Sequence, residues 1–148
     1  MYSSTKIIEL GSCAFRQWRA EGTHCRFVHG YRIMAKFWFT STELDHRNWV
    51  VNFGGLKGLK KILQEQFDHT LCIAEDDPLL DSFRALDAEG GCQLRVMPAV
   101  GIEKTAEWCF NAAKEFLENT QETKGRCKIT KVEVWEHEQN SAIYETKY

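Results

Sequence analysis

The clearest pattern in the sequence is a strict alternation of hydrophobic and polar positions in the first third of the chain. Hydrophobic residues occupy every second position there: Tyr31, Ile33, Ala35, Phe37 and Phe39. Because successive side chains of a β-strand point to opposite faces, this pattern predicts a long strand with one buried face. A second strand is predicted over residues 6–18, where Gly11 indicates a bulge.

Three later segments have hydrophobic residues at helical spacing. The first covers residues 56–67 and carries lysines on its other side. The second starts at Asp77, a residue type that caps helix N-termini, with Pro78 at the first helical position, and it ends at the glycine pair 90–91. Its hydrophobic stripe consists of Leu79, Leu80, Phe83 and Leu86. The third helix is predicted over residues 102–117.

The remaining extended segments lie mostly near the end of the chain. They are residues 49–53, 92–97, 127–138 and 141–146. Strands at both ends of the chain with helices between them predict an α+β fold, with an antiparallel sheet and helices packed on one face. No linker or repeat divides the chain, so we expect a single domain, residues 1–148.

Composition and charge limit the classes of function. The formal net charge is -2 and charged residues are spread along the chain, so no basic surface predicts nucleic acid as a partner. The N-terminus lacks the hydrophobic core of a signal peptide, and no apolar run approaches the roughly 18 residues of a membrane helix. We therefore expect a cytoplasmic protein without a membrane partner.

The six cysteines are widely spaced and form no CxxC pair. In a protein with no sign of secretion, this spacing predicts reduced thiols, most of them buried as small hydrophobic residues. Cys25 is the exception that we consider for chemistry. It stands in the segment HCRFVHGYRI, four residues before His29, at the entrance of the long predicted strand.

Three other polar residues are candidates for a site, although each also has an ordinary structural interpretation. Asp68 and His69 follow the first predicted helix, where a histidine can interact favourably with the helix dipole. Glu136 lies in the segment VEVWEHE, where it could be one of several exposed carboxylates. By residue type alone, Cys25 could equally be a buried thiol and His29 a hydrogen-bonding residue of its strand.

These segments, in this order, resemble the 6-pyruvoyl-tetrahydropterin and 6-carboxy-tetrahydropterin synthase family. The shared features are the CxxxHG strand, WVVNF, the amphipathic helix followed by FDH, and the C-terminal WE and AIY, and they cover nearly the whole chain. The resemblance implies the tunnelling fold, or T-fold, whose subunits pair sheets edge to edge into barrels and commonly form hexamers. It also implies a lyase of queuosine or folate-related biosynthesis that acts on dihydroneopterin triphosphate with zinc, a cysteine and an Asp–His pair.

The resemblance assigns roles to individual residues. Cys25 corresponds to the cysteine that acts as general base, and Asp68 and His69 correspond to the catalytic Asp–His pair. Glu136 corresponds to the acidic residue that holds the amino and ring NH groups of the pterin. Glu103 corresponds to the glutamate of a PTxE turn, although a glycine stands here in place of the threonine.

The three zinc-binding histidines that the resemblance implies are incomplete. His29 matches one of them, but Arg16 lies at or beside the first position and Tyr31 occupies the third. Catalytic zinc usually has three protein ligands, and a guanidinium cannot ligate. We therefore predict no metal and no other cofactor, with Arg16, Tyr31 and His29 contacting the ligand instead. Cys13 and His24 are the alternative zinc ligands, which their positions in strand and loop do not favour.

Two classes of function remain open. The first is an enzyme acting on a pterin or a related purine-derived triphosphate, in which Arg16 and Tyr31 stabilise an oxyanion while Cys25 or His69 transfers protons. The second is a non-catalytic pterin-binding or nucleotide-binding protein. The presence of cysteine, aspartate and histidine together favours the enzyme, and a structural oligomer without a ligand is a third alternative. The long strands also predict a homo-oligomer, a trimer or hexamer, because free sheet edges tend to pair.

Overall fold

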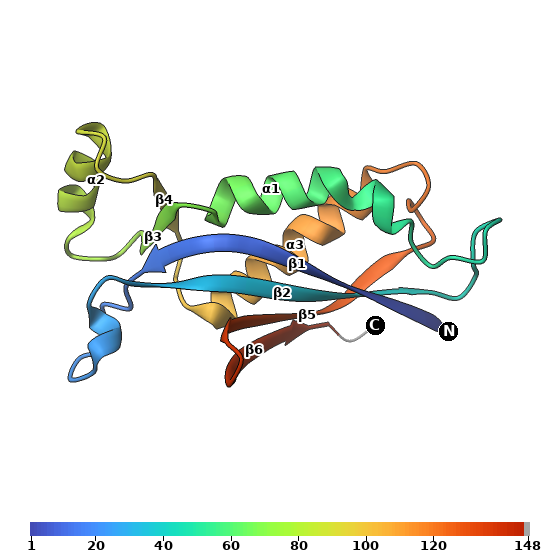
Figure 1. The fold of residues 1–148 in the computed structure, drawn as a ribbon, viewed down its shortest axis with the longest axis horizontal. Coiled ribbons are helices and arrows are strands. Elements are labelled where there is room, and N and C mark those ends of the chain that lie inside the picture. The colour runs from blue at the N-terminus through green and yellow to red at the C-terminus, as the bar shows by residue number, and fades with distance from the viewer. Residues whose placement is uncertain (147–148) are drawn as a thin grey trace.

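The computed structural model describes residues 1–146, so the last two residues of the expected domain lie outside the described residues. Within these residues, strands form one sheet in the order β4-β3-β1-β2-β5-β6. The strands are β1 (Tyr2–Phe15), β2 (His29–Ser41), β3 (Thr70–Ala74), β4 (Leu94–Met97), β5 (Lys128–His137) and β6 (Asn140–Glu145). The helices are α1 (Lys57–Phe67), α2 (Leu80–Ala88) and α3 (Ile102–Glu118). Helices α1 and α3 pack on one face of the sheet (Figure 1), which confirms the α+β prediction.

The core lies between the sheet and these two helices, as the periodicity predicts. On β2, the side chains of Ile33, Ala35, Phe37 and Phe39 are fully buried, and Tyr31 is half-buried. The helices contribute Leu59, Leu63, Phe67, Ala106, Cys109 and Ala113, all fully buried. The hydrophobic residues that alternate along the strands and those at helical spacing on α1 and α3 therefore pack against each other in one core.

Strands β1 and β2 pair antiparallel along their whole length, with a bulge between Glu9 and Gly11. Gly11 has a φ of 114°, which side chains other than glycine rarely adopt. A Cβ at this position would lie 2.1 Å from Oδ1 of Asp68. The predicted bulge is confirmed, and its glycine leaves the space in which the Asp68 carboxylate lies.

The sheet is mixed, in contrast to the antiparallel sheet expected from the sequence. Strand β3 pairs in parallel with β1 over Cys13–Phe15 and with β4 on its other side. All five residues of β3 are buried. Because both faces are covered, the strand has no alternation of hydrophobic and polar positions, and the sequence analysis did not identify it.

Helix α2 differs from its prediction in its start and in its packing. It begins at Leu80, because Asp77 instead forms a turn in which its carboxylate accepts the backbone N–H of Leu79 at 2.8 Å. No residue of α2 is buried, and Leu79 and Leu86 are 46% and 41% exposed. The predicted hydrophobic stripe is therefore not part of the core. No helix within residues 1–146 is long and apolar enough to cross a membrane.

The segment at residues 49–53 is a loop where the sequence predicted a short extended piece. It contributes the buried side chains of Val50 and Val51 and leads into a 3-10 turn, Phe53–Leu56, which precedes α1. The backbone N–H of Gly54 donates to Oδ1 of Asn52 at 3.0 Å, which caps this turn. The segment thus packs against the core without joining the sheet.

The six cysteines have the environments that the sequence predicted. Cys13, Cys72, Cys109 and Cys127 are buried, Cys92 is half-buried and Cys25 is exposed, and each is a free thiol. Burial raises the pKa of the Cys127 thiol to about 11, which keeps it protonated and unreactive at neutral pH. Cys25 is therefore the one cysteine that solvent reaches freely.

Candidate functional site

Cys25 lies at one end of the β1–β2 hairpin. Phe15, the last residue of β1, pairs with His29, the first residue of β2, and the chain between them folds into a loop. Within this loop, Cys25 is the middle residue of a 3-10 turn whose N-cap, Thr23, accepts the Cys25 N–H through its hydroxyl at 3.2 Å. The hairpin therefore presents an exposed thiol next to the start of β2.

Aromatic rings pack around His29. Its ring centroid lies 4.8 Å from that of Phe15 and 5.4 Å from that of Tyr31, and His137 lies 6.2 Å from Tyr31. The Nδ1 atom of His29 is 2.8 Å from the carbonyl oxygen of Phe27. Because a carbonyl can only accept, Nδ1 carries the proton, which leaves Nε2 of the neutral ring free to accept a hydrogen bond.

The Tyr31 hydroxyl is influenced by the charges of both Cys25 and Glu136. Partial burial raises the pKa of the Tyr31 hydroxyl, and the Glu136 carboxylate and the ionised form of Cys25 raise it further. The hydroxyl therefore stays protonated at neutral pH and can donate a hydrogen bond. The Glu136 carboxylate accepts from Nδ2 of Asn140 at 3.1 Å, and the same Nδ2 lies 3.0 Å from Nε2 of His137. The structure thus places Tyr31 in ring contact with His29 and His137, and the charges of Glu136 and of an ionised Cys25 act on its hydroxyl.

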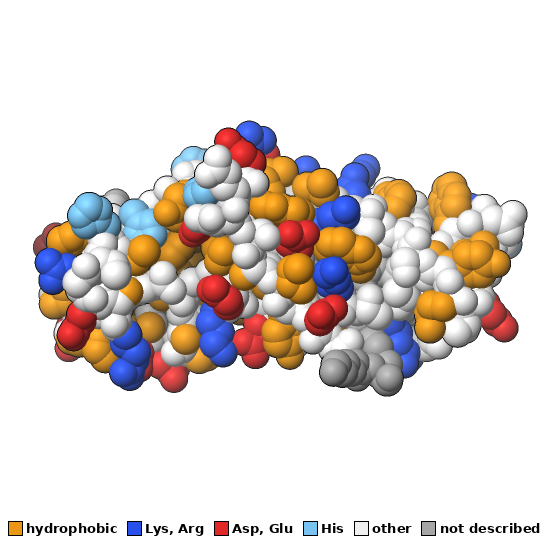
Figure 2. Space-filling model, turned by 90° about the horizontal axis from the view of Figure 1, so that it is seen from below, with side chains coloured by type: hydrophobic (Ala, Val, Ile, Leu, Met, Phe, Trp, Pro, Cys, Tyr) orange, Lys and Arg blue, Asp and Glu red, His pale blue; other side chains and the backbone are white. Residues whose placement is uncertain are grey.

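A cavity of about 460 Å³ opens beside Glu136. It is lined by Ile7, Arg32, Met34, Trp135, Glu136, His137 and Glu138. The strands that carry most of these residues are β1, β2 and β5, and the described helices cover only the other face of the sheet (Figure 1). On the view from below, hydrophobic side chains are mixed with charges of both signs, and several histidines are visible in the left half (Figure 2). The volume falls in the range of about 300–1,000 Å³ that is typical of small-molecule sites.

Arg16 is paired with Asp77, which the sequence analysis did not predict. The guanidinium donates through Nε and Nη2 to the two carboxylate oxygens, at 2.7 and 2.8 Å, and through Nη1 to the carbonyl oxygen of Arg26 at 3.3 Å. Burial alone would raise the pKa of Asp77, but Arg16 and the Leu79 N–H outweigh it and hold that pKa below its usual range. Because the two residues are far apart in sequence, no local pattern could indicate this pair.

Asp68 and His69 lie on the other edge of β1, away from Cys25. Oδ1 of Asp68 accepts the Ser12 N–H at 3.1 Å and lies 2.8 Å from Nδ1 of His69. The His69 N–H donates to the Ser12 carbonyl at 2.6 Å, and its φ is 58°. His29 pairs with the end of β1 from the β2 side, whereas His69 immediately precedes β3. The aspartate and histidine thus form a separate, exposed pair in a single chain.

Glu103 lies in the first turn of α3 and is exposed. The preceding Gly101 has a φ of 122°, and a Cβ there would lie 2.5 Å from Nε2 of Gln17 and 3.5 Å from Oε2 of Glu103. The backbone conformation at position 101 therefore favours glycine, where the family that this sequence resembles has threonine. Glu103 approaches the segment after β1 from the helix side of the sheet.

The donor set does not fit a zinc ion. Within residues 1–146, no three histidine, cysteine, aspartate or glutamate side chains gather closely enough to hold a metal. The alternative ligand Cys13 is buried, with its sulfur 3.7 Å from that of Cys72, and His24 is exposed in the loop. His29 thus has no second ligand from either residue in a single chain.

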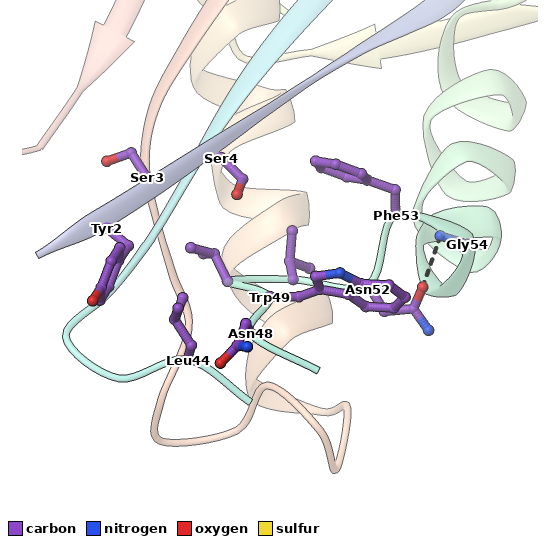
Figure 3. A pocket seen from close by; sticks show the side chains of 11 residues that line it. Tyr2, Ser3, Ser4, Leu44, Asn48, Trp49, Asn52, Phe53 and Gly54 are labelled. Atoms are coloured by element: carbon purple, nitrogen blue, oxygen red, sulfur yellow. Dashed lines mark hydrogen bonds between the residues drawn. The ribbon is translucent and has the colours of Figure 1, made fainter. Parts of the chain in front are cut away.

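A second cavity, of about 340 Å³, lies at the opposite end of the hairpin (Figure 3). Its wall includes Tyr2, Leu44, Trp49 and Phe53, of which the three aromatic residues are 52%, 45% and 44% exposed in that order. The sequence analysis treated this region as an extended segment. The available signal for an exposed hydrophobic wall was the pair of aromatic residues in WVVNF, Trp49 and Phe53, which lie on either side of the two valines.

Comparisons with known proteins place the whole chain in one group. The sequence profile described as 6-pyruvoyl tetrahydropterin synthase matches residues 9–147. The 6-carboxy-5,6,7,8-tetrahydropterin synthase of Aquifex aeolicus is 27% identical over 123 residues, which cover 81% of this chain and 75% of the relative. The protein of the same description from Rickettsia conorii is 37% identical over 54 residues, which are 36% of this chain and 39% of the relative's length.

Solved structures show the same fold. An uncharacterised protein from Wolinella succinogenes superposes with a TM-score of 0.82 at 20% identity, over 99% of this chain and 98% of the other. The 6-pyruvoyl tetrahydropterin synthase of Caenorhabditis elegans superposes with a TM-score of 0.67 at 16% identity, over 99% and 96%. The fold is the T-fold, and the chain belongs to the 6-pyruvoyl tetrahydropterin synthase family.

Proposed function

We propose that this protein is a synthase-like enzyme that acts on dihydroneopterin triphosphate, or on a related purine-derived ligand, without zinc. The observation that carries the proposal is the position of Glu136 in the wall of a cavity of about 460 Å³, which also includes His137, whose ring lies 6.2 Å from that of Tyr31. A carboxylate can accept hydrogen bonds from the amino and ring NH groups of a pterin, and such charge-assisted bonds orient the ring. Trp135 and Met34 supply apolar surface for that ring.

The same residues provide groups for proton transfer. Cys25 acts as the general base, and Tyr31 donates its hydroxyl hydrogen to an oxygen on which negative charge develops. The Nε2 atom of His29 accepts a hydrogen bond from the substrate. These roles need no metal, because the charge is stabilised by hydrogen-bond donors already held in place by burial and ring packing.

Asp68 and His69 enter this scheme through a second copy of the chain. They lie on the far edge of β1 from Cys25, so we propose that the Asp–His pair of one subunit completes the site of its neighbour in a homo-oligomer. Strand β6 at the edge of the sheet supports this proposal, because β5 is its one strand partner within residues 1–146. The N-terminal part of β1 supports it too, since β1 pairs with β3 only over Cys13–Phe15.

A non-catalytic pterin-binding protein is the second candidate. One observation favours it: the Arg16 charge is neutralised by Asp77, so a free cation next to His29 is not available to stabilise an oxyanion. Glu136 and its cavity would serve binding equally well.

The test combines metal analysis with a product assay by mass spectrometry. Protein purified without a metal-binding tag is incubated with dihydroneopterin triphosphate, and zinc is measured in the same sample. We expect product at less than one-tenth of a zinc per subunit, and a rate at least about 100-fold lower for Cys25→Ala. Binding without product favours the second candidate. Stoichiometric zinc, or wild-type turnover by Cys25→Ala, contradicts the proposed chemistry.

A further inference from the structure

Asp77 is a charged residue with a completely buried side chain. It lies in the turn between β3 and α2, outside the residues that the proposed reaction uses. Its two carboxylate oxygens accept hydrogen bonds from Nε and Nη2 of Arg16, and Oδ1 also accepts the Leu79 N–H. A bidentate pair of this kind fixes the plane and direction of the guanidinium.

Arg16 extends this anchor to the turn that carries Cys25. Its remaining Nη1 group donates to the carbonyl oxygen of Arg26, which follows Cys25 directly, at 3.3 Å. The backbone N–H of Gln17 donates to the carbonyl oxygen of Cys25 at 2.9 Å. Residues 24–28 are all exposed, so hydrophobic packing does not hold this turn in place. Hydrogen bonds from the segment after β1 provide its connection to the sheet.

We propose that Asp77 is a positioning residue that, through Arg16, holds the Cys25 turn at the end of the β1–β2 hairpin. The inference rests on the function proposed above, in which Cys25 transfers a proton. A general base must lie within hydrogen-bond reach of the proton that it removes, and small displacements lower the rate. Without the hydrogen bond from Arg16, the turn would keep the Cys25 thiol, but the position of the thiol would no longer be fixed.

The neighbouring residue Asp76 offers a matched comparison. Its carboxylate accepts from Nη2 of Arg19 at 2.9 Å and from Nε1 of Trp18 at 3.1 Å, so it joins the same two segments. The Arg19 and Asp76 side chains are 73% and 49% exposed, however, and within residues 1–146 their recorded side-chain hydrogen bonds do not involve the turn at residues 24–26. Exposed ion pairs hold their partners weakly. Removing the Asp76 charge should leave the Cys25 turn unchanged.

Hydrogen exchange measured by mass spectrometry on wild type, Asp77→Asn and Asp76→Asn tests the inference directly. We expect the hydrogen-bonded amides of this turn, those of Cys25 and Phe27, to exchange about tenfold faster in Asp77→Asn and at the wild-type rate in Asp76→Asn. Amides in the centre of β2 report on global stability, so any loss of stability in Asp77→Asn appears there, and they should stay more protected than residues 24–28 in all three proteins. Equal exchange of residues 24–28 in the two variants would overturn the proposal.

A second variant guards against misfolding of Asp77→Asn. In Arg16→Lys, a positive charge remains beside Asp77, but the ammonium group lacks the planar fork that binds both carboxylate oxygens and the Arg26 carbonyl together. The same increase in exchange at residues 24–28 is expected. Wild-type exchange in Arg16→Lys would show that the guanidinium does not hold the turn.

Steady-state kinetics with dihydroneopterin triphosphate then separate positioning from simple destabilisation. We expect kcat of Asp77→Asn to fall by about tenfold or more while KM stays within about twofold, because Glu136 on β5 is untouched. Asp77→Glu should recover part of kcat. A kcat equal to that of Asp76→Asn overturns the inference. If wild type shows no turnover, the proposed function fails, and the exchange rates still decide whether Asp77 holds the turn.

Discussion

At the scale of single residues, Arg16 and Tyr31 stand where the family resemblance places zinc-binding histidines, and their surroundings differ. Arg16 is committed to Asp77 and to the Arg26 carbonyl. Within residues 1–146, no hydrogen bond to the Tyr31 hydroxyl is formed, and burial and the Glu136 charge raise its pKa. Of the two residues that replace histidines, Arg16 is therefore the one whose polar group is already engaged by a buried carboxylate.

Glu136 is the residue whose substitution tests ligand recognition. Glu136→Gln keeps the size of the side chain but removes the charge, so a hydrogen bond to the pterin should fall from about 1.5–3 kcal/mol to at most the roughly 0.5–1.5 kcal/mol of a neutral bond. We expect pterin affinity measured by calorimetry to fall at least about tenfold, with an unchanged unfolding midpoint. Glu138→Gln, at the same cavity, is the control. Unchanged affinity in Glu136→Gln would mean that another carboxylate binds the ligand or that the ligand is of another class.

The lowered pKa of Asp77 predicts that the free energy of unfolding depends on pH. Its folded-state pKa is lowered, so its contribution is complete above the unfolded-state value of about 3.9 and is lost as pH falls through the folded-state value. Asp77→Asn leaves the Arg16 charge uncompensated and should cost up to about 3–5 kcal/mol at pH 7. The difference from wild type in urea unfolding should shrink between pH 5 and pH 2. A constant difference across that range would contradict the assignment of the lowered pKa.

At the scale of elements, the β1 bulge, β3 and α2 determine where the site residues lie. The bulge at Gly11 leaves space for the Asp68 carboxylate, and β3 begins directly after His69. The bulge and the start of β3 therefore together fix the position of the Asp–His pair. Helix α2 contributes no buried residue and instead follows the turn that supplies Asp77. The bulge and α2 thus serve the candidate site more than the core, whereas β3 belongs to the core as well.

Gly11→Ala should therefore disturb more than backbone geometry. The positive φ alone costs about 1–3 kcal/mol for a residue with a Cβ, and the new methyl group would also collide with Asp68. Gly22 is a matched control, because it has a φ of 76° but no atom within 4 Å of a built Cβ. We expect Gly11→Ala to lower the unfolding free energy in urea clearly more than Gly22→Ala does. Equal losses would show that Asp68 moves aside at no cost.

At the scale of the whole molecule, a single chain leaves the candidate site divided. Cys25, Tyr31 and Glu136 lie at one end of the hairpin, and the Asp–His pair lies on the other edge of β1. The aromatic cavity with Trp49 and Phe53 lies at the opposite end (Figure 3). Association of several copies is the arrangement that can bring such separated surfaces together.

Multi-angle light scattering tests this expectation. At micromolar concentration we expect a mass of three or six times 17.2 kDa. Removing hydrogen bonds at the β6 edge, for instance with Ile143→Pro, should shift the population toward monomer, because proline cannot donate to a neighbouring strand. A monomer at all concentrations would remove both the oligomer and the shared site.

The sequence by itself determined the regular parts of this protein. Alternation on β2 and β5 and helical spacing on α1 and α3 follow from local geometry, and the order of the motifs indicated the T-fold and the candidate residues. The tertiary structure decided which candidates meet. Strand β3 is buried on both faces and has no period to detect, and the pairing of Arg16 with Asp77 depends on where that strand ends. Contacts between distant segments are set by strand order and packing, which no local pattern records.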